Sequence, residues 1–256
     1  MRVERVPVEV STRAPTGETA CYVLGREEAL LVDPAAPDDR IEAALDRVSH
    51  VAVTHHHPDH VGAVADYAAA ADATVWCRNG YADDFRKATG AEPDRTFAEG
   101  TAVETGDGPV VVRDTPGHAP EHVAFETPDA LVAGDLAVAA GSVVVASPEG
   151  DMRAYLASLR RVLGRSPDRL LPAHGPVVDD PAATCERLIA HRLDRERRVL
   201  AAVEDGNRTV ADITDAAYDK DLTGVRDLAG LTVRAHLDKL AAAARVKWDG
   251  SRADPI

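Results

Sequence analysis

The stretch VAVTHHHPDHVGA, residues 51–63, places four histidines and one aspartate within six consecutive positions. The β-branched residues before His55 predict a short strand, and the apolar spacing after His60 predicts a helix. In α/β folds, loops at the carboxyl ends of strands commonly form the functional site. His55, His57, Asp59 and His60 all carry atoms that bind metals such as zinc. We therefore interpret this loop as part of a metal site.

Four ligands on one loop cannot all surround one ion, because alternate side chains point apart. The pattern favours two neighbouring ions, the first bound by His55 and His57 and the second by Asp59 and His60. His56 lies between these positions, so its side chain is expected to point away from the metals and to have a structural or exposed role.

Three later loops supply further ligands, and each follows an apolar strand and contains Gly or Pro. They are DTPGHAPEH with His118, LVAGDLA with Asp135 and LLPAHGP with His174. We expect His118 to complete the first ion, His174 to complete the second, and Asp135 to bridge them. Any one of these residues alone is more typical of a capping or core position, but their combination is not expected by chance.

Two regions follow one another along the chain. Strand and helix patterns alternate up to residue 180, which predicts an α/β layered domain over 1–180. Residues 181–256 form a helical domain, in which three helical patterns are followed by the short strand VKWDG, the order typical of a winged helix-turn-helix.

The net charge is −14, and residues 1–180 carry all of it because residues 181–256 balance to zero. Such acidity, with only four lysines, fits either a halophilic host or a GC-rich genome. DNA-binding domains are usually basic, so we do not expect the tail to bind DNA. We expect it to pack beside the mouth of the active site or at a homodimer interface.

No membrane or secretory signal is evident. The chain has no apolar run of about 18 residues, and its N-terminus reads as a strand rather than a signal peptide. The three cysteines, Cys21, Cys77 and Cys185, are isolated and form no disulfide or metal motif. These features predict a cytoplasmic protein without a membrane partner.

The motifs THHHPDHVGA, TPGHAPEH, AGDLA and PAHGP resemble those of the metallo-β-lactamase superfamily, in the same order. The region from TPGHAPEH onward, with the tail, is most similar to the β-lactamase-like protein 2 branch. The resemblance implies a four-layer αββα sandwich with a dinuclear site, followed by a winged-helix domain. It also implies that Asp33 lies near the metals. A glycine that often follows the bridging aspartate closely is delayed here to Gly141, so that wall of the pocket is expected to differ.

Such a site predicts a metal-dependent hydrolase that activates water with two divalent ions. Imidazole and carboxylate ligands without thiolate favour zinc, with iron or manganese as alternatives. Asp59, Asp135 and His122 are the side chains expected to contribute to catalysis. His122 is a candidate proton donor to the leaving group, although a structural role is favoured for it.

The motifs leave the substrate open. The first hypothesis is hydrolysis of a small ester, thioester or lactone, and the second is a phosphodiester-cleaving, single-strand endoribonuclease of the β-lactamase-like protein 2 type. Other readings are a glyoxalase II-like thioesterase, a nucleic-acid-binding regulator and an iron-dependent persulfide dioxygenase. The expected partner is therefore a small ester or thioester, or single-stranded RNA.

Overall fold

A computed structural model describes all 256 residues, and they form two compact units. The sheet unit comprises Met1–Thr115, Glu121–Gly141 and Ser166–Pro181. The helical unit comprises Pro116–Pro120, Ser142–Arg165 and Ala182–Ile256. The sequence pattern assigned residues 116–120 and 142–165 to the first domain, so the boundary at residue 180 stays a prediction.

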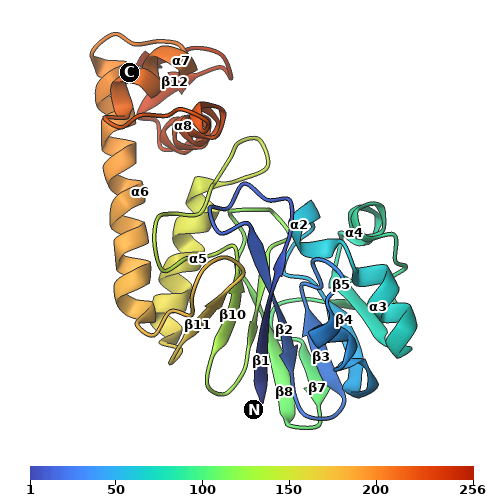
Figure 1. Cartoon of the computed structure of the whole chain (residues 1–256). Coiled ribbons are helices and arrows are strands. Elements are labelled where there is room, and N and C mark those ends of the chain that lie inside the picture. Colours follow the sequence, from blue (N-terminus) through green and yellow to red (C-terminus); the bar gives the residue numbers. More distant parts are fainter. The chain divides into compact units, whose positions relative to one another are not determined.

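The first sheet of the sheet unit has six strands in sequence order (Figure 1). β1, β2 and β3 pair antiparallel, whereas β3, β4, β5 and β6 pair parallel. The strands are β1 (Val3–Glu9), β2 (Glu18–Leu24), β3 (Ala29–Val32), β4 (Val48–Ala52), β5 (Thr74–Arg78) and β6 (Arg95–Phe97). The carboxyl ends of β3 and β4 consequently lie at one edge, together with the start of β2.

Short helices connect the parallel strands. They are α1 (Asp39–Glu42), α2 (Pro58–Val61), α3 (Val64–Ala71) and α4 (Ala82–Thr89), with a 3₁₀ turn at Leu45–Arg47. α1 begins after Asp38, whose side chain caps it by accepting a hydrogen bond from the amide of Arg40. α2 begins at Pro58, whose missing amide proton and fixed φ suit the first turn of a helix.

The second sheet has five strands in the order β11-β10-β9-β8-β7. The strands are β7 (Ala102–Thr105), β8 (Gly108–Asp114), β9 (Val123–Glu126), β10 (Leu131–Gly134) and β11 (Leu170–Pro172). β7, β8, β9 and β10 pair antiparallel, and β10 pairs parallel with β11. β8, β10 and β11 thus run in the same direction, which brings their carboxyl ends to one edge.

Two apolar clusters hold the sheet unit together. One lies between the two sheets and includes Tyr22 and Leu30 of the first sheet and Val112 and Phe125 of the second. The other lies between the six-stranded sheet and its helices, and includes Ile41 of α1, Tyr67 of α3 and Phe85 of α4. These clusters give the sheet unit three layers, of helices, sheet and sheet. The full four-layer αββα arrangement stays a prediction.

The helical unit contains four helices, including the three longest of the chain. They are α5 (Met152–Arg165), α6 (Pro181–Glu204), α7 (Val210–Ala217) and α8 (Arg226–Ala242), and an antiparallel pair follows, β12 (Val246–Trp248) with β13 (Ala253–Pro255). Val199, Ile213, Leu237 and Val246 lie in one apolar cluster that joins α6, α7, α8 and β12. α6, α7 and α8 followed by β12 is the order that the sequence predicts, β13 is an additional strand, and the assignment as a winged helix stays a prediction.

None of the helices combines the length and the apolar composition needed to cross a membrane.

Candidate metal centre

The histidine-rich loop follows β4 directly and leads into α2. His55 and His60 are fully buried, whereas His57 and Asp59 are partly exposed. Asp135 follows β10 and His174 follows β11 at the shared edge of the second sheet, and His118 lies in the loop between β8 and β9.

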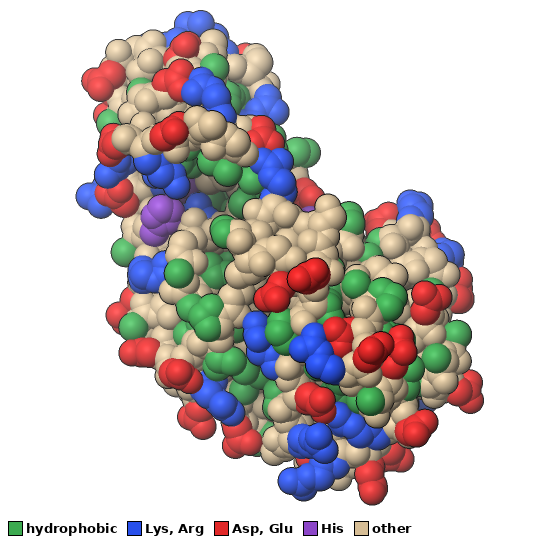
Figure 2. All heavy atoms as spheres, viewed as in Figure 1, with side chains coloured by type: hydrophobic (Ala, Val, Ile, Leu, Met, Phe, Trp, Pro, Cys, Tyr) green, Lys and Arg blue, Asp and Glu red, His purple; other side chains and the backbone are tan.

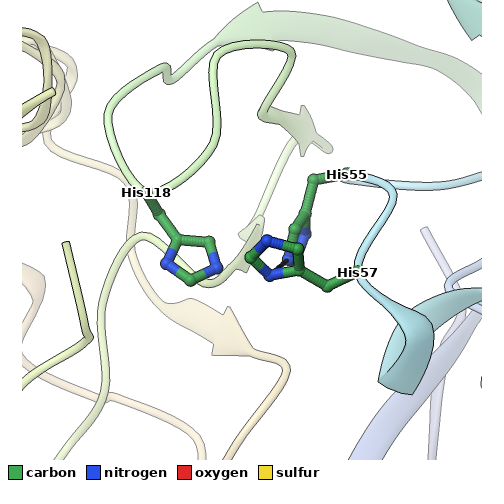
Figure 3. Close-up of side chains that lie close together, drawn as sticks. All are labelled: His55, His57 and His118. Carbon is green, nitrogen blue, oxygen red and sulfur yellow. Dashed lines mark hydrogen bonds between the residues drawn. The ribbon is translucent and has the colours of Figure 1, made fainter. Parts of the chain in front are cut away.

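All seven predicted ligands belong to three interlocking groups. Within each group the nitrogen or carboxylate oxygen atoms that could hold a metal lie within 4.8 Å of one another. The groups are His55–His57–His118, His55–His60–Asp135 and Asp59–His60–His174. Figure 3 shows the rings of the first group converging, with His55 and His57 on one loop and His118 on another. Asp135 shares its group with His55, which also belongs to the first group, and with His60, which also belongs to the third. A ligand that bridges two ions needs such a position between the two outer groups.

Four of the five imidazoles are hydrogen-bonded through Nδ1, which leaves Nε2 toward the other ligands. Nδ1 lies 3.0 Å from Thr54 Oγ1 in His55, 3.0 Å from Asp33 Oδ2 in His60, 2.7 Å from the Val144 carbonyl in His118 and 2.8 Å from the Glu18 carbonyl in His174. Such bonds fix the ring and its tautomer in metal-binding histidines. In His57 it is Nδ1 that points inward, 3.0 Å from Nε2 of His55.

The distances between these atoms suit a bound metal. His174 Nε2 lies 3.3 Å from Asp135 Oδ1 and 3.6 Å from Asp59 Oδ2, and His60 Nε2 lies 3.8 Å from Asp135 Oδ1. Ligands about 2.0–2.1 Å from a tetrahedral zinc ion are separated by roughly 3.4 Å. His60 Nε2 is also buried without a hydrogen-bond partner, an arrangement that is costly unless a ligand occupies the space. The residues therefore fit a pair of divalent ions.

The local electrostatic field also favours cations. Burial lowers the pKa of His60, but the charge and hydrogen bond of Asp33, together with Asp135 and Asp59, outweigh it and raise the pKa to about 9. For His174, burial likewise lowers the pKa, and the hydrogen bond and charge of Asp135 raise it above its ordinary value. Carboxylates that attract a proton this strongly also attract a divalent cation.

Asp33 contacts one candidate ligand directly and another through Thr54. Its carboxylate accepts hydrogen bonds from the Thr54 amide at 2.6 Å and the Thr54 hydroxyl at 2.8 Å, and it contacts His60. The hydroxyl of Thr54 has only one proton, so it accepts from Nδ1 of His55, whose Nε2 then presents its lone pair. Asp33 has a φ of 52°, a left-handed conformation that aspartate tolerates better than most residues. Asp33 thus lies beside candidate ligands, and its place near the metals stays a prediction.

His122 is held by hydrogen bonds at both of its ring nitrogens. Its Nδ1 lies 2.8 Å from Thr115 Oγ1, and its Nε2 accepts a hydrogen bond of 3.0 Å from the amide of Asp135. The ring is buried, and it fixes the backbone at the turn after β10. A Cβ on Gly134 would lie 2.7 Å from His122 Nε2, so this turn needs glycine. These contacts favour the structural role for His122, and its part in catalysis stays a prediction.

His56 and Glu121 support the loop from its other side. His56 is in none of the three groups, and its ring packs at 5.6 Å from that of Phe85. Glu121 is only 5% exposed and accepts a 3.0 Å hydrogen bond from the amide of His56. Sequence reasoning missed Glu121, although an acidic residue between His118 and His122 was a visible signal.

Residues 14–174 match the family model described as the metallo-beta-lactamase superfamily. The chain belongs to this superfamily. Members of this superfamily contain dinuclear metal sites. The three groups of His and Asp side chains in this chain fit such a site. The family and the mixed α/β fold expected from the motifs are thus confirmed.

Two curated superfamily relatives align with most of the chain. The first is a "Beta-lactamase-like protein 2 homolog" from Drosophila melanogaster, 26% identical over 247 residues, covering 87% of this chain and 82% of the relative. The second is an "Atrochrysone carboxyl ACP thioesterase" from Aspergillus fumigatus, 27% identical over 218 residues, covering 80% of this chain and 66% of the relative.

Solved structures show the same fold. A beta-lactamase domain protein from Burkholderia ambifaria has a TM-score of 0.81 at 22% identity, and the match covers 99% of this chain and 91% of that one. A protein crystallised in a di-iron-bound form has a TM-score of 0.55 at 30% identity, and the match covers 72% of this chain and 98% of that one.

Proposed function

We propose that this protein is a dinuclear metal-dependent hydrolase that cleaves a small thioester or ester with a metal-activated water. The observation that carries the proposal is the position of Asp135. It lies in the group with His55 and His60, and its Oδ1 is 3.3 Å from His174 Nε2, so one carboxylate connects the two sets of imidazoles.

A bound pair of divalent ions would supply the acidity that turns water into a nucleophile near neutral pH. The chain's own residues hold that site in place. Asp135 is fixed through its amide by His122, and His60 and His174 are oriented by Asp33 and the Glu18 carbonyl. Imidazole and carboxylate ligands favour zinc, and iron is the alternative that the di-iron relative supports.

The cysteines offer no competing nucleophile. All three are buried, and burial raises the pKa of Cys21 to about 12 and that of Cys185 to about 11. The pKa of Cys77 is also raised by burial. A thiol with a raised pKa is protonated at neutral pH and reacts poorly.

The leaving group favours a thioester. Attack of hydroxide on a thioester forms a C–O bond and breaks the C–S bond, which yields a thiolate and a carboxylic acid that loses its proton to solvent. Both ring nitrogens of His122 are engaged, so a group that departs without taking a proton suits this site. A thiol, with a pKa of about 8–9, leaves as an anion far more readily than an alkoxide. The similarity to a relative named as an ACP thioesterase supports the same choice.

Single-strand endoribonuclease activity is the second candidate, supported by the similarity to a β-lactamase-like protein 2 homolog. Charge argues against it. A shallow, open hollow of about 500 Å³ at the β1–β2 hairpin is lined in part by Glu9 and Glu18. On the face shown in Figure 2, acidic and basic side chains are intermingled without a continuous basic stripe. A polyanion binds through such a stripe.

The deciding experiment compares turnover of acyl thioesters, aryl esters, lactones and a fluorogenic single-stranded RNA by the metal-loaded protein. We expect thioester cleavage, measured as free thiol, that disappears after chelation and returns with zinc or iron. Asp135→Asn is the control, because it preserves shape and removes the connecting charge. Turnover of RNA alone, abolished by Asp135→Asn, would replace the thioesterase proposal by the second candidate. Turnover that survives both chelation and Asp135→Asn would refute both.

A further inference from the structure

The loop between β1 and β2 is a compact hairpin turn rather than an irregular connection. The amide of Val10 donates to the Gly17 carbonyl, and the amide of Gly17 donates to the Ala14 carbonyl, both at 3.1 Å. The amide of Ala14 in turn donates to the hydroxyl of Thr12 at 3.1 Å. The position of the Thr12 hydroxyl is therefore fixed by the loop's own backbone.

That hydroxyl donates its single proton to a candidate metal ligand. Thr12 Oγ1 lies 2.5 Å from Asp59 Oδ2, across 47 positions of sequence. A hydroxyl bonded to a carboxylate makes one of the shorter and stronger hydrogen bonds in proteins. The same oxygen of Asp59 faces His174 Nε2 at 3.6 Å, so the bond restrains the carboxylate at the oxygen that faces the other ligands.

The hairpin also holds a second member of the same group. At the start of β2, the Glu18 carbonyl accepts from Nδ1 of His174 at 2.8 Å. This is a consequence of the sheet order, because β2 begins beside the end of β3 at the edge where the site lies. Within the group Asp59–His60–His174, the hairpin thus orients Asp59 and His174, and Asp33 orients His60.

We propose that Thr12 is a positioning residue for Asp59, and that the β1–β2 hairpin selectively sets the affinity of the metal position formed by Asp59, His60 and His174. The inference rests on the proposed dinuclear site. The ligands of the other metal position are oriented by residues outside the hairpin. The Thr54 hydroxyl hydrogen-bonds with His55, and the Val144 carbonyl accepts a hydrogen bond from His118. Residues that orient ligands typically contribute a factor of about 10–100 to metal affinity.

Thermodynamic linkage gives a second, independent consequence. If the hairpin stabilises the bound ion, the ion must stabilise the hairpin by the same free energy. Metal binding should therefore slow hydrogen exchange at the amides of Val10 and Gly17, and this slowing should require the Thr12 hydroxyl.

The test compares Thr12→Val with Thr12→Ser and with Ser11→Ala. Valine keeps the shape and removes the hydroxyl, serine restores it, and Ser11 is an exposed neighbour in the same loop. We expect Thr12→Val to release one of two ions to a chelator about 10–100 times faster, with the other ion unchanged. Thr12→Ser and Ser11→Ala should behave like the wild type. Thermal melting of the apo proteins checks that each variant folds.

Hydrogen exchange is measured on the same proteins with and without metal. In the wild type, metal should slow exchange at residues 10–17, and in Thr12→Val this slowing should be lost. If the wild type holds two ions and Thr12→Val keeps both as tightly, or loses both equally, the inference is wrong while the proposed function stands. If the wild type itself holds fewer than two ions, the proposed function and this inference fail together.

Discussion

The loop after β4 and helix α6 both bury charged or titratable side chains, but the surroundings of these side chains differ. At the candidate site, Thr54 and Asp33 hold one nitrogen of His55 and of His60, and the other nitrogen faces neighbouring ligands. On α6, Arg192 and Arg195 are 3% and 9% exposed and have no such neighbours. Their guanidinium groups donate to carbonyls of residues 143 and 217 and pack on tyrosine rings.

This difference separates two uses of buried polarity. In α6, backbone carbonyls and tyrosine rings offset part of the cost of burying two cations, although the Nε of each guanidinium has no hydrogen-bond partner. At the site, one nitrogen of each histidine ring is hydrogen-bonded by the protein, and carboxylates lie near the other nitrogen. Substitutions at the site should therefore reduce metal binding, and substitutions in α6 should reduce stability.

The largest expected effect comes from removing the connecting carboxylate. Asp135→Ala should lower hydrolysis by at least about 10³-fold and reduce the metal content to one ion or fewer, because Asp135 is shared by the two sets of histidines. Elemental analysis and turnover on the same preparation measure both. Asp84→Asn, on the exposed face of α4, serves as the matched control. Two tightly held ions in Asp135→Ala would contradict the bridging role.

Adjacent histidines provide the next test. His57→Ala removes a member of the first group and should weaken one ion by more than about 100-fold, beyond the loss typical of a residue that only orients a ligand. His56→Ala should keep both ions and lower the free energy of unfolding by about 1 kcal/mol, because it loses packing against Phe85. Equal loss of metal in the two variants would contradict the expectation that the side chain of His57 points toward the metals and that of His56 points away from them.

Much of the site could be predicted because strand ends are readable in a sequence. His55, Asp135 and His174 each follow an apolar strand directly, and functional sites in α/β folds lie at such strand ends, so the sequence predicts that they meet. That β4 belongs to one sheet and β10 and β11 to the other could not be read from these motifs. The structure brings all seven candidates together, and their role as ligands stays a prediction.

Supporting contacts could not be predicted in the same way. Thr12 reaches Asp59 across 47 positions, through a turn that no local pattern connects to the site. His122 occupies a position that equally suits a proton donor, and only the bond from the Asp135 amide distinguishes the two roles. The grouping of residues 142–165 with the tail depends on tertiary packing, which the strand and helix periodicities do not encode.

A smaller effect is expected in α6. Arg195→Ala should lower the free energy of unfolding by about 2 kcal/mol, because it removes packing on Tyr218 and leaves a buried carbonyl without its donor. Arg197→Ala, on the same helix but 78% exposed, should change it by less than about 0.5 kcal/mol. Denaturant unfolding measures both. If folded Arg195→Ala lost metal without losing stability, the expectation that α6 substitutions act on stability and not on metal binding would be wrong.

The smallest expected effect is a pH dependence within the helical unit. Burial lowers the pKa of His236, the carboxylate of Glu196, 3.7 Å from its Nδ1, opposes this, and the charges of Arg192 and Lys239 add to the lowering. The folded state therefore keeps His236 neutral, while the unfolded chain protonates it near its ordinary pKa of about 6.5. Its contribution to stability is fully present above that pH and is lost as the pH falls through and below it.

His236→Leu isolates this contribution. Both ring nitrogens of His236 are buried without hydrogen-bond partners, so an apolar side chain of similar size should change stability by less than about 1.5 kcal/mol at pH 8. The difference in melting temperature between variant and wild type should then shift in favour of the variant between pH 7 and pH 5, since leucine takes up no proton on unfolding. The comparison is made on metal-free protein, and each melting temperature is referred to the wild type at the same pH, which cancels the titration of His60 and His174. A constant difference across this range would mean that His236 is protonated equally in the folded and unfolded states. The buried histidine of the helical unit would then differ from those of the site only in lacking neighbouring ligands, and not in the charge state that the fold imposes on it.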